Sequence, residues 1–450
     1  MQTKQLAEFC LSLTGETLSD EVIRMGKDCV EDMLGVAIAG AGTPQGSIWK
    51  SYFSPRFPGG EAAAWNPGFP RMAYAGAAAL NAAYGHLLDM DDVHSSSITH
   101  LGAITIPTAL ALGSAFHRSG REVLAAIAAG YEVGARIGEA VNPGAYHFWH
   151  TTGVVGSSAA AAVAGKLLHL TSEQYLHAFG SAGTQAAGLW EFLEDGAMSK
   201  PLHTANATLC GIRSAELARL GLTGASRILE GERGLVKALS PSPDLAALTR
   251  QLDPQNLRIL QNSFKPYACC RHLHGACRAL QNLMKQGVAP ENVVSITDFT
   301  YAVSKNTVDC PAPATPYAGK FSVQFCLAAA LCGHDLMPRT FSAEVLTQPA
   351  IRDLMPRIRT EIDPELEAIY QADHHCWPHR LQVTLTDGRV LEEYVAYPPG
   401  DPDNPFSRED HDRKFCRLLS GILPPEQINL LLYRIRTMDE LEDVGQLFPR

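Results

Sequence analysis

The chain has 450 residues, of which 46% are hydrophobic and 19% charged, a composition typical of globular proteins rather than disordered or fibrous ones. This length exceeds what one ordinary hydrophobic core holds, so two domains are expected. The formal net charge of −10, without a basic stripe that could neutralise phosphates, argues against nucleic acid as a partner.

The sequence gives no sign of secretion or of a membrane anchor. Met1 to Glu21 lacks a basic segment followed by an apolar run and a small-residue cleavage site. The longest uncharged apolar stretch, Leu101 to Phe116, is short for a membrane span and contains Pro107. Eleven cysteines without repeated spacing are typical of reduced thiols. We therefore expect a cytoplasmic protein with no membrane partner.

The N-terminal part of the chain predicts a domain of closely packed helices. In Asp20–Ala39 the apolar residues fall near one helical stripe, and Ser19 or Asp20 is available as the N-cap. Alanine dominates the other helical segments, and alanine-rich helices can approach one another closely. These further segments are Ala73–Leu88, Arg121–Ala140, Val154–Leu168, Ser172–Ala187 and Thr204–Leu220.

After about residue 265 the pattern changes to alternating strands and helices. Val294 to Val303 alternates as a strand with a bulge would, and the segments before and after Asp387-Gly388 predict a β-hairpin. Helices are expected at Cys270–Leu283 and Phe321–Leu331. The sequence thus predicts a mainly α protein with a smaller α/β domain.

The predicted domain boundaries follow from these changes of pattern. The α/β domain is expected over residues 266–396, where strands and helices alternate. Ser407 and Asp410 predict the start of a last helical piece that runs to Leu419. The helical domain is therefore expected to combine both chain ends, residues 1–265 and 397–450.

The densest polar cluster follows the helix predicted at Ala73–Leu88. It contains His86, Asp89, Asp91 and Asp92, with His100 just beyond. His86 and Asp89 are three residues apart and would share a helix face. The cluster fits either a helix end with solvated carboxylates or a zinc or manganese site. Its spacing matches no established metal motif, so we expect no metal.

Two further candidates stand at predicted helix starts. His150 precedes the helix that opens near Gly153, where backbone N–H groups could bind an anion. His147 is expected to be buried against a carbonyl. Lys200 precedes Pro201 at the next helix start, and the positive helix end there would lower its pKa. Lys200 could instead be an ordinary surface lysine or a lysine that binds pyridoxal phosphate. No cofactor motif supports the pyridoxal-phosphate alternative.

A concentrated basic segment lies at the predicted domain boundary. Lys265, Arg271, His272, His274 and Arg278 occur within fourteen residues of an acidic protein. Such a cluster is what an anionic substrate would need. Motifs of nucleotide, nicotinamide, serine-hydrolase and zinc-protease sites are lacking. Acid–base chemistry by aspartate, histidine and lysine is the remaining interpretation.

In this order and spacing, the clusters resemble the MmgE/PrpD family over nearly the whole chain. The matching motifs are His86-x-x-Asp89-x-Asp-Asp, His100-x-Gly, His150-x-Thr, Ser-Lys200-Pro-Leu-His and Lys265-Pro-Tyr-x-Cys-Cys-Arg. The family includes 2-methylcitrate dehydratases, cis-aconitate decarboxylases and iminodisuccinate epimerases. The resemblance implies a large helical domain with a smaller α/β lid, a homodimer, no required cofactor and an active site between the domains.

The resemblance also implies site residues. By position, Asp89, His100, His150, Lys200 and Lys265 match the pocket residues of the family. We expect Lys200 and one of the two histidines to transfer protons and Asp89 to orient a histidine. Lys265 and Arg271 are expected to hold substrate carboxylates, with His86 and Tyr267 as further substrate-binding candidates.

Departures from the family patterns favour one activity. The decarboxylase-like pattern Asp-Phe-Asp-Asp-Thr ends here in Val93, and the decarboxylase-type tyrosine is replaced by Val323. The expected activity is therefore proton transfer beside a carboxylate in a small dicarboxylate or tricarboxylate, foremost epimerisation of iminodisuccinate. A lyase of the 2-methylcitrate dehydratase type is the first alternative. A metal-dependent hydrolase using the His86–His100 cluster is the alternative from another class.

Overall fold

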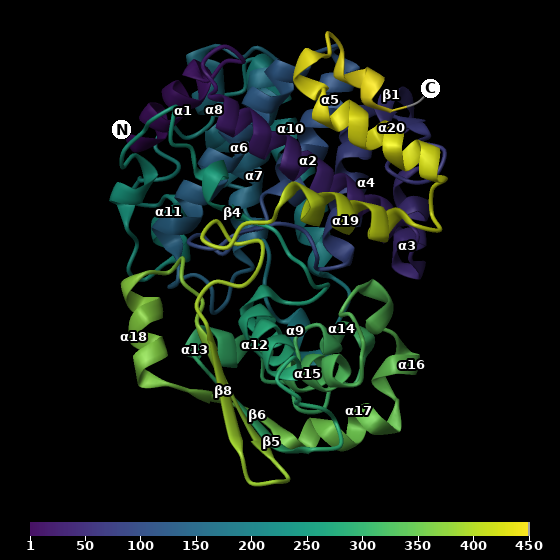
Figure 1. Ribbon diagram of the computed structural model, residues 1–450. Helices are drawn as coiled ribbons and strands as arrows, with labels where there is room; N and C mark the ends of the chain where they lie inside the picture. The colour runs from purple at the N-terminus through teal and green to yellow at the C-terminus, as the bar shows by residue number, and fades with distance from the viewer. Residues whose placement is uncertain (449–450) are drawn as a thin grey trace.

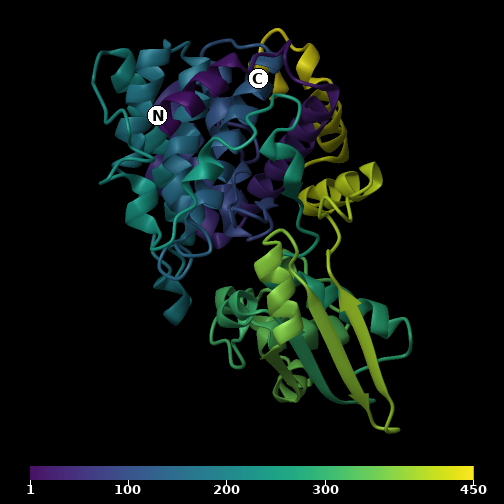
Figure 2. The same cartoon turned by 90° about the vertical axis from the view of Figure 1, so that its left-hand side faces the viewer.

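The computed structural model describes residues 1–448 as two bodies, one almost wholly helical and one carrying the longer strands (Figures 1 and 2). The predicted fold class, mainly α with a smaller α/β part, is confirmed. The helical body is built from α1 (Gln2–Ser12), α2 (Asp20–Ala41), α3 (Pro44–Phe53), α4 (Tyr74–Leu87), α5 (Gly102–Ala115), α6 (Gly120–Val141), α7 (Thr151–Leu167), α8 (Ser172–Gly183), α10 (Lys200–Arg219), α11 (Leu235–Leu239), α19 (Arg408–Leu419) and α20 (Pro425–Arg436). The short helix α9 (Phe192–Asp195) lies against the α/β body, where Leu193 packs on the core.

The centre of the helical body is a group of helices that pack very closely. Helix α10 lies against α7 and α4, and α7 also packs against α6. A Cβ added at Gly211 of α10 would lie 2.4 Å from the Ala160 Cβ of α7, so this contact requires glycine. The predicted close approach of small-residue helices is therefore present. Between residues 1 and 448, no helix is both long and apolar enough to cross a membrane.

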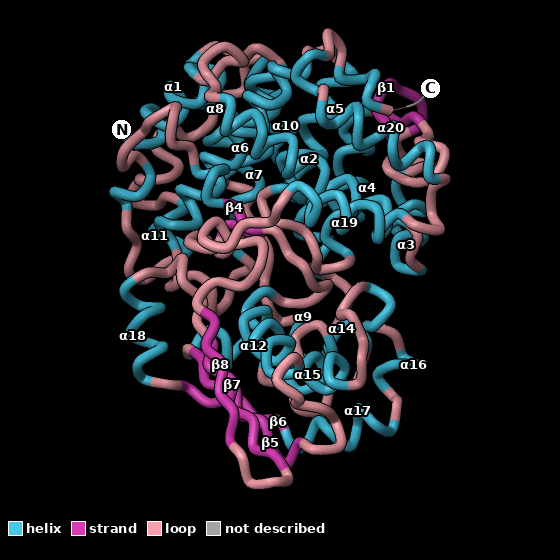
Figure 3. The backbone as a smooth tube through the Cα atoms, viewed as in Figure 1, coloured by secondary structure: helices cyan, strands magenta, loops and turns pink. Residues whose placement is uncertain are grey.

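The α/β body packs its helices against a four-stranded sheet, which holds most of the strand segments in Figure 3. The strand order is β6-β5-β7-β8; β5 pairs with β6 in parallel, and the other pairs are antiparallel. Two short antiparallel pairs, β1 (Pro58–Ala63) with β2 (Arg71–Met72) and β3 (Val93–His94) with β4 (Asn262–Ser263), lie outside this sheet. The elements of the α/β body are α12 (His274–Met284), β5 (Val293–Thr300), α13 (Ala302–Val308), α14 (Pro316–Gly319), α15 (Val323–Leu331), α16 (Ala343–Leu346), α17 (Pro349–Leu354), β6 (Ile358–Ile362), α18 (Pro364–Ala372), β7 (His379–Leu385) and β8 (Val390–Val395).

Several predicted elements differ at their ends. The strand expected to reach Val303 stops at Thr300, because Tyr301 is the N-cap of α13. Helix α8 ends at Gly183 rather than at Ala187, whereas α10 starts at Lys200, before the predicted Thr204. The hairpin is confirmed, with Gly388 at φ +86° in its turn.

The chain passes between the two bodies twice, and the two crossings contact each other. The Phe264 amide donates to the Gly400 carbonyl at 2.8 Å, and Arg271 forms a buried ion pair with Asp401 at 2.8 Å. A Cβ at Gly400, whose φ is +86°, would lie 2.1 Å from the Phe264 carbonyl oxygen. After the second crossing, α19 packs on α2 of the helical body. The boundaries at residues 265 and 397 stay a prediction.

Candidate active site

The first feature of the site is a buried carboxylate that contacts two ammonium groups. Asp89 follows the end of α4 with φ +53°, a left-handed conformation that few residues other than glycine adopt. Its Oδ1 accepts hydrogen bonds from Lys200 Nζ at 2.7 Å and from Lys265 Nζ at 3.3 Å. Lys265 also donates to the Asp89 carbonyl at 3.0 Å. Three segments far apart in sequence thus converge on one point.

The charges of this cluster follow from burial and pairing. Burial acts to raise the pKa of Asp89, but the two ammonium groups outweigh it and hold that pKa well below its usual range. Burial acts to lower the pKa of Lys265, but Asp89 and Asp91 outweigh it and the pKa is raised. Lys265 therefore stays charged despite the neighbouring ammonium of Lys200.

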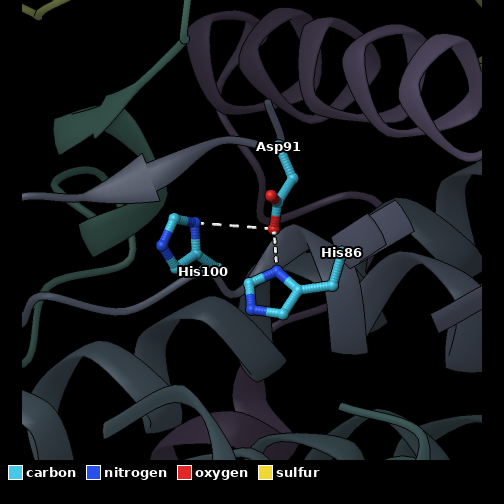
Figure 4. Close-up of side chains that lie close together, drawn as sticks. All are labelled: His86, Asp91 and His100. Carbon is cyan, nitrogen blue, oxygen red and sulfur yellow. Dashed lines mark hydrogen bonds and ion pairs between the residues drawn. The ribbon is translucent and has the colours of Figure 1, made fainter. Parts of the chain in front are cut away.

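A second carboxylate, Asp91, stands between two histidines (Figure 4). Its Oδ2 lies 2.7 Å from His86 Nδ1 and 3.5 Å from His100 Nδ1. The expectation that Asp89 orients a histidine is thus corrected, because Asp89 is bound by the lysines and Asp91 has this position. His100 Nδ1 also lies 2.8 Å from the carbonyl oxygen of Asp92.

That carbonyl determines which nitrogen of His100 carries the proton. A carbonyl oxygen can only accept, so His100 Nδ1 must donate. Burial lowers the pKa of His100 well below 6.5, against the nearby charge of Asp91. The ring is therefore neutral near pH 7, and its Nε2 carries a lone pair.

His150 is the N-cap of α7, which starts at Thr151, two residues before the predicted Gly153. Its ring stacks on His86 with centroids 5.3 Å apart, and its Nδ1 lies 3.0 Å from His203 Nδ1. Burial and the charge of Lys200 lower the pKa of His150 well below 6.5, so this ring is also neutral near pH 7. His147, expected to be buried, is exposed.

Asp89, Lys200, Lys265, His100 and His150 line a small cavity between the two bodies. Its volume is about 20 Å³, roughly the room that one water needs. A polycarboxylate can therefore enter only when the walls move apart. The wall residues are Asp89, Val93, Ile98, His100, Tyr146, His150, Trp190, Lys200 and Lys265 on the side of the helical body and Cys270, Arg271, His272, Phe321 and Trp377 on the other.

Two of the expected substrate-binding residues do not line the cavity, and a third lines it with its charge already paired. Tyr267 is not among the wall residues, and its hydroxyl donates to Gln281 at 2.8 Å. His86 is fully buried behind His150 and Asp91. Arg271 does line the cavity, but its guanidinium is already paired with Asp401.

The His86–His100 cluster was also the basis of the metal-hydrolase alternative. Ligand atoms of His86, Asp91 and His100 lie within 4.8 Å of one another. His100 Nδ1 is protonated and donates to a carbonyl, however, so it cannot bind a metal in this arrangement. The donor set therefore fits a hydrogen-bonded carboxylate–histidine network better than a metal site.

Comparison with known proteins identifies the family. The chain is 27% identical to human cis-aconitate decarboxylase, in an alignment that covers 96% of this chain and 90% of the human protein. The cis-aconitate decarboxylase-like protein oryM of Aspergillus oryzae is 26% identical, over 82% of this chain and 81% of that protein. The cis-aconitate decarboxylase of Aspergillus terreus is 25% identical, over 99% of this chain and 94% of that protein. The MmgE/PrpD N-terminal domain matches residues 4–248 and the MmgE/PrpD C-terminal domain residues 267–434. The chain therefore belongs to the MmgE/PrpD family, as its motifs indicated.

Proposed function

We propose that this chain is an enzyme that transfers a proton at a carbon beside a carboxylate in a small dicarboxylate or tricarboxylate. The observation that carries this proposal is the buried pair Lys200 and Lys265 around Asp89, in one cavity with two neutral histidines. The cluster of two cations and one anion has a net positive charge, which suits a ligand with several carboxylates.

The shared chemical problem of such reactions is a carbanion whose charge spreads onto a neighbouring carboxylate. Fixed cations stabilise this charge most in a dry site, where little solvent screens them. We assign Lys265 to hold a carboxylate, because its raised pKa keeps it charged. His100 Nε2 is the candidate base and the Lys200 ammonium the candidate acid. Arg271 and Asp401 together support the wall at which a second carboxylate would bind.

Two outcomes of this chemistry have separate support. A lyase reaction, with loss of CO₂ or water from a tricarboxylate, is favoured by the nearly full-length similarity to cis-aconitate decarboxylases. Epimerisation of iminodisuccinate is favoured by Val93, which lines the cavity without the hydroxyl of the decarboxylase-like pattern. We place the lyase first. The homodimer and the cytoplasmic location stay predictions.

The deciding experiment offers three acids to the purified protein in D₂O. With cis-aconitate, a decarboxylase releases CO₂; with 2-methylcitrate, a dehydratase forms an unsaturated acid that absorbs in the ultraviolet. With iminodisuccinate, an epimerase places deuterium on the inverting carbon and forms no alkene. Turnover of none of them, at millimolar concentration, would refute the proposal.

The matched variants are Lys200→Met and Lys265→Met, with the exposed Lys285→Met as control. Loss of one charge-assisted contact in a buried site should lower kcat/KM by roughly 100-fold or more. Lys285→Met should keep the rate of the unchanged protein. Full activity of Lys265→Met would remove the carboxylate anchor from the proposal.

A further inference from the structure

One histidine of the cavity wall has no assigned role in the proposed chemistry. His272 comes from the short turn Arg271–Leu273 of the α/β body and is 1% exposed. Its ring stacks on Trp377 with centroids 4.0 Å apart and planes at 12°. The edge of Tyr146 packs against it from the helical body. The ring is therefore held rigidly at the boundary between the two bodies.

The protonated nitrogen of His272 follows from its contact with Tyr301. His272 Nδ1 lies 2.6 Å from the Tyr301 hydroxyl oxygen. Within residues 1–448 this hydroxyl has no other hydrogen-bond acceptor, and burial raises its pKa so that it keeps its proton. If His272 Nδ1 donated instead, the Tyr301 O–H and the His272 Nε2 lone pair would both be unpaired, whereas donation by the hydroxyl leaves only the Nε2–H unpaired, which costs less. The hydroxyl therefore donates to Nδ1.

The other ring nitrogen is then an N–H donor. Burial lowers the pKa of His272 to about 3, so the ring is neutral and has a single proton, on Nε2. In the described part of the chain, Nε2 is buried and has no hydrogen-bond partner. His100 has the opposite arrangement, with its proton on Nδ1 and a lone pair on Nε2. The wall thus offers one acceptor and one donor from rings of the same type.

We propose that His272 is a substrate-binding residue whose Nε2–H donates a hydrogen bond to a carboxylate oxygen of the bound polycarboxylate. This inference rests on the proposed function and adds to it a contact from the α/β body. A carboxylate satisfies the buried donor, whereas an alkyl group at the same place leaves it unpaired. His272 would therefore select acids with a carboxylate at this position.

Variants test the contact through its donor. His272→Phe keeps an aromatic ring beside Trp377 but removes the donor, and should lower kcat/KM by roughly 10- to 100-fold. His272→Gln restores an N–H at a similar distance from the backbone and should recover about tenfold of that loss. His334→Phe, outside the cavity, is the control and should be unchanged. Activity of His272→Phe within about twofold of the unchanged protein would overturn the inference.

A measurement without turnover separates this inference from the proposed function. Nitrogen-15 NMR of histidine-labelled protein should show His272 as the Nε2–H tautomer and His100 as the Nδ1–H tautomer. Added tricarballylate, an unreactive tricarboxylate, should shift the His272 Nε2 signal. An Nδ1–H tautomer at His272, or no response of its signal at millimolar tricarballylate, refutes the inference. If these signals behave as expected and no acid is turned over, the proposed function alone fails.

Discussion

Lys320 links the two segments that carry the site, and its replacement gives a quantitative prediction. Its ammonium donates to the Leu88 carbonyl at 2.6 Å and to the Ala268 carbonyl at 2.9 Å. Leu88 directly precedes Asp89, and Ala268 lies three residues after Lys265. The side chain is buried, with the ring of Phe341 4.6 Å from the ammonium. In Lys320→Met two buried carbonyls lose their donor, which should cost about 2–6 kcal/mol of unfolding free energy at pH 7.

The pH dependence of that loss has a definite sign. Burial lowers the pKa of Lys320 from 10.5 to about 8. Between these values the unfolded chain binds the proton and the folded chain does not, so this residue's contribution to stability rises with pH. The gap between the unchanged protein and Lys320→Met should widen by up to about 3 kcal/mol from pH 8 to pH 10.5.

Urea titrations of both proteins at pH 7.0, 8.5 and 10, at equal ionic strength, measure the gap. Lys320→Arg, which keeps the charge but not the compact ammonium, should recover only part of the loss. A gap that narrows as the pH rises would refute the reasoning, because it would mean that an anionic partner, and not the two carbonyls, holds the charge.

Two other predictions concern Asp92 and metal ions. Burial, with the nearby charge of Asp32, raises the pKa of Asp92 to about 7. The folded protein therefore binds a proton that the unfolded chain has lost, and this contribution to stability disappears as the pH rises from about 4 through 7. Asp92→Asn should accordingly gain stability relative to the unchanged protein, by up to about 4 kcal/mol at pH 8. Urea midpoints at pH 5 and pH 8 measure this, and an equal difference at both pH values would contradict it. Turnover should survive exhaustive chelation by EDTA, since His100 Nδ1 is engaged by a carbonyl; a loss of turnover that Zn²⁺ or Mn²⁺ restores would revive the hydrolase alternative.

The sequence was sufficient to predict the fold class, and the family resemblance predicted the convergence of the main charged residues. The spacing of apolar residues and the alanine content identify the helices, because helix formation depends largely on the local sequence pattern. The Asp387-Gly388 turn was equally local and correctly predicted the hairpin. The starting point of α10 was harder to predict, since Pro201 permits a helix to begin either before or after Lys200.

The partners within the site could not be predicted from spacing. The left-handed φ of Asp89 turns its carboxylate toward the lysines and leaves Asp91 beside the histidines, and no pattern in the sequence encodes that turn. The protonation states depend on burial competing with charge, which only the folded geometry decides. His272 was seen in the sequence as part of a basic segment. Its role depends on Tyr301 and Trp377, which reach it from distant segments.

The paired crossings between the bodies limit how the cavity can open. A single flexible linker would allow the α/β body to bend, twist and slide relative to the helices. Here the two linkers are tied together by the Phe264–Gly400 hydrogen bond and the Arg271–Asp401 ion pair, so twisting would have to break these contacts. Bending about the line through both linkers keeps them intact. The contacts between the linkers therefore favour bending over twisting as the motion that opens the cavity beside His272.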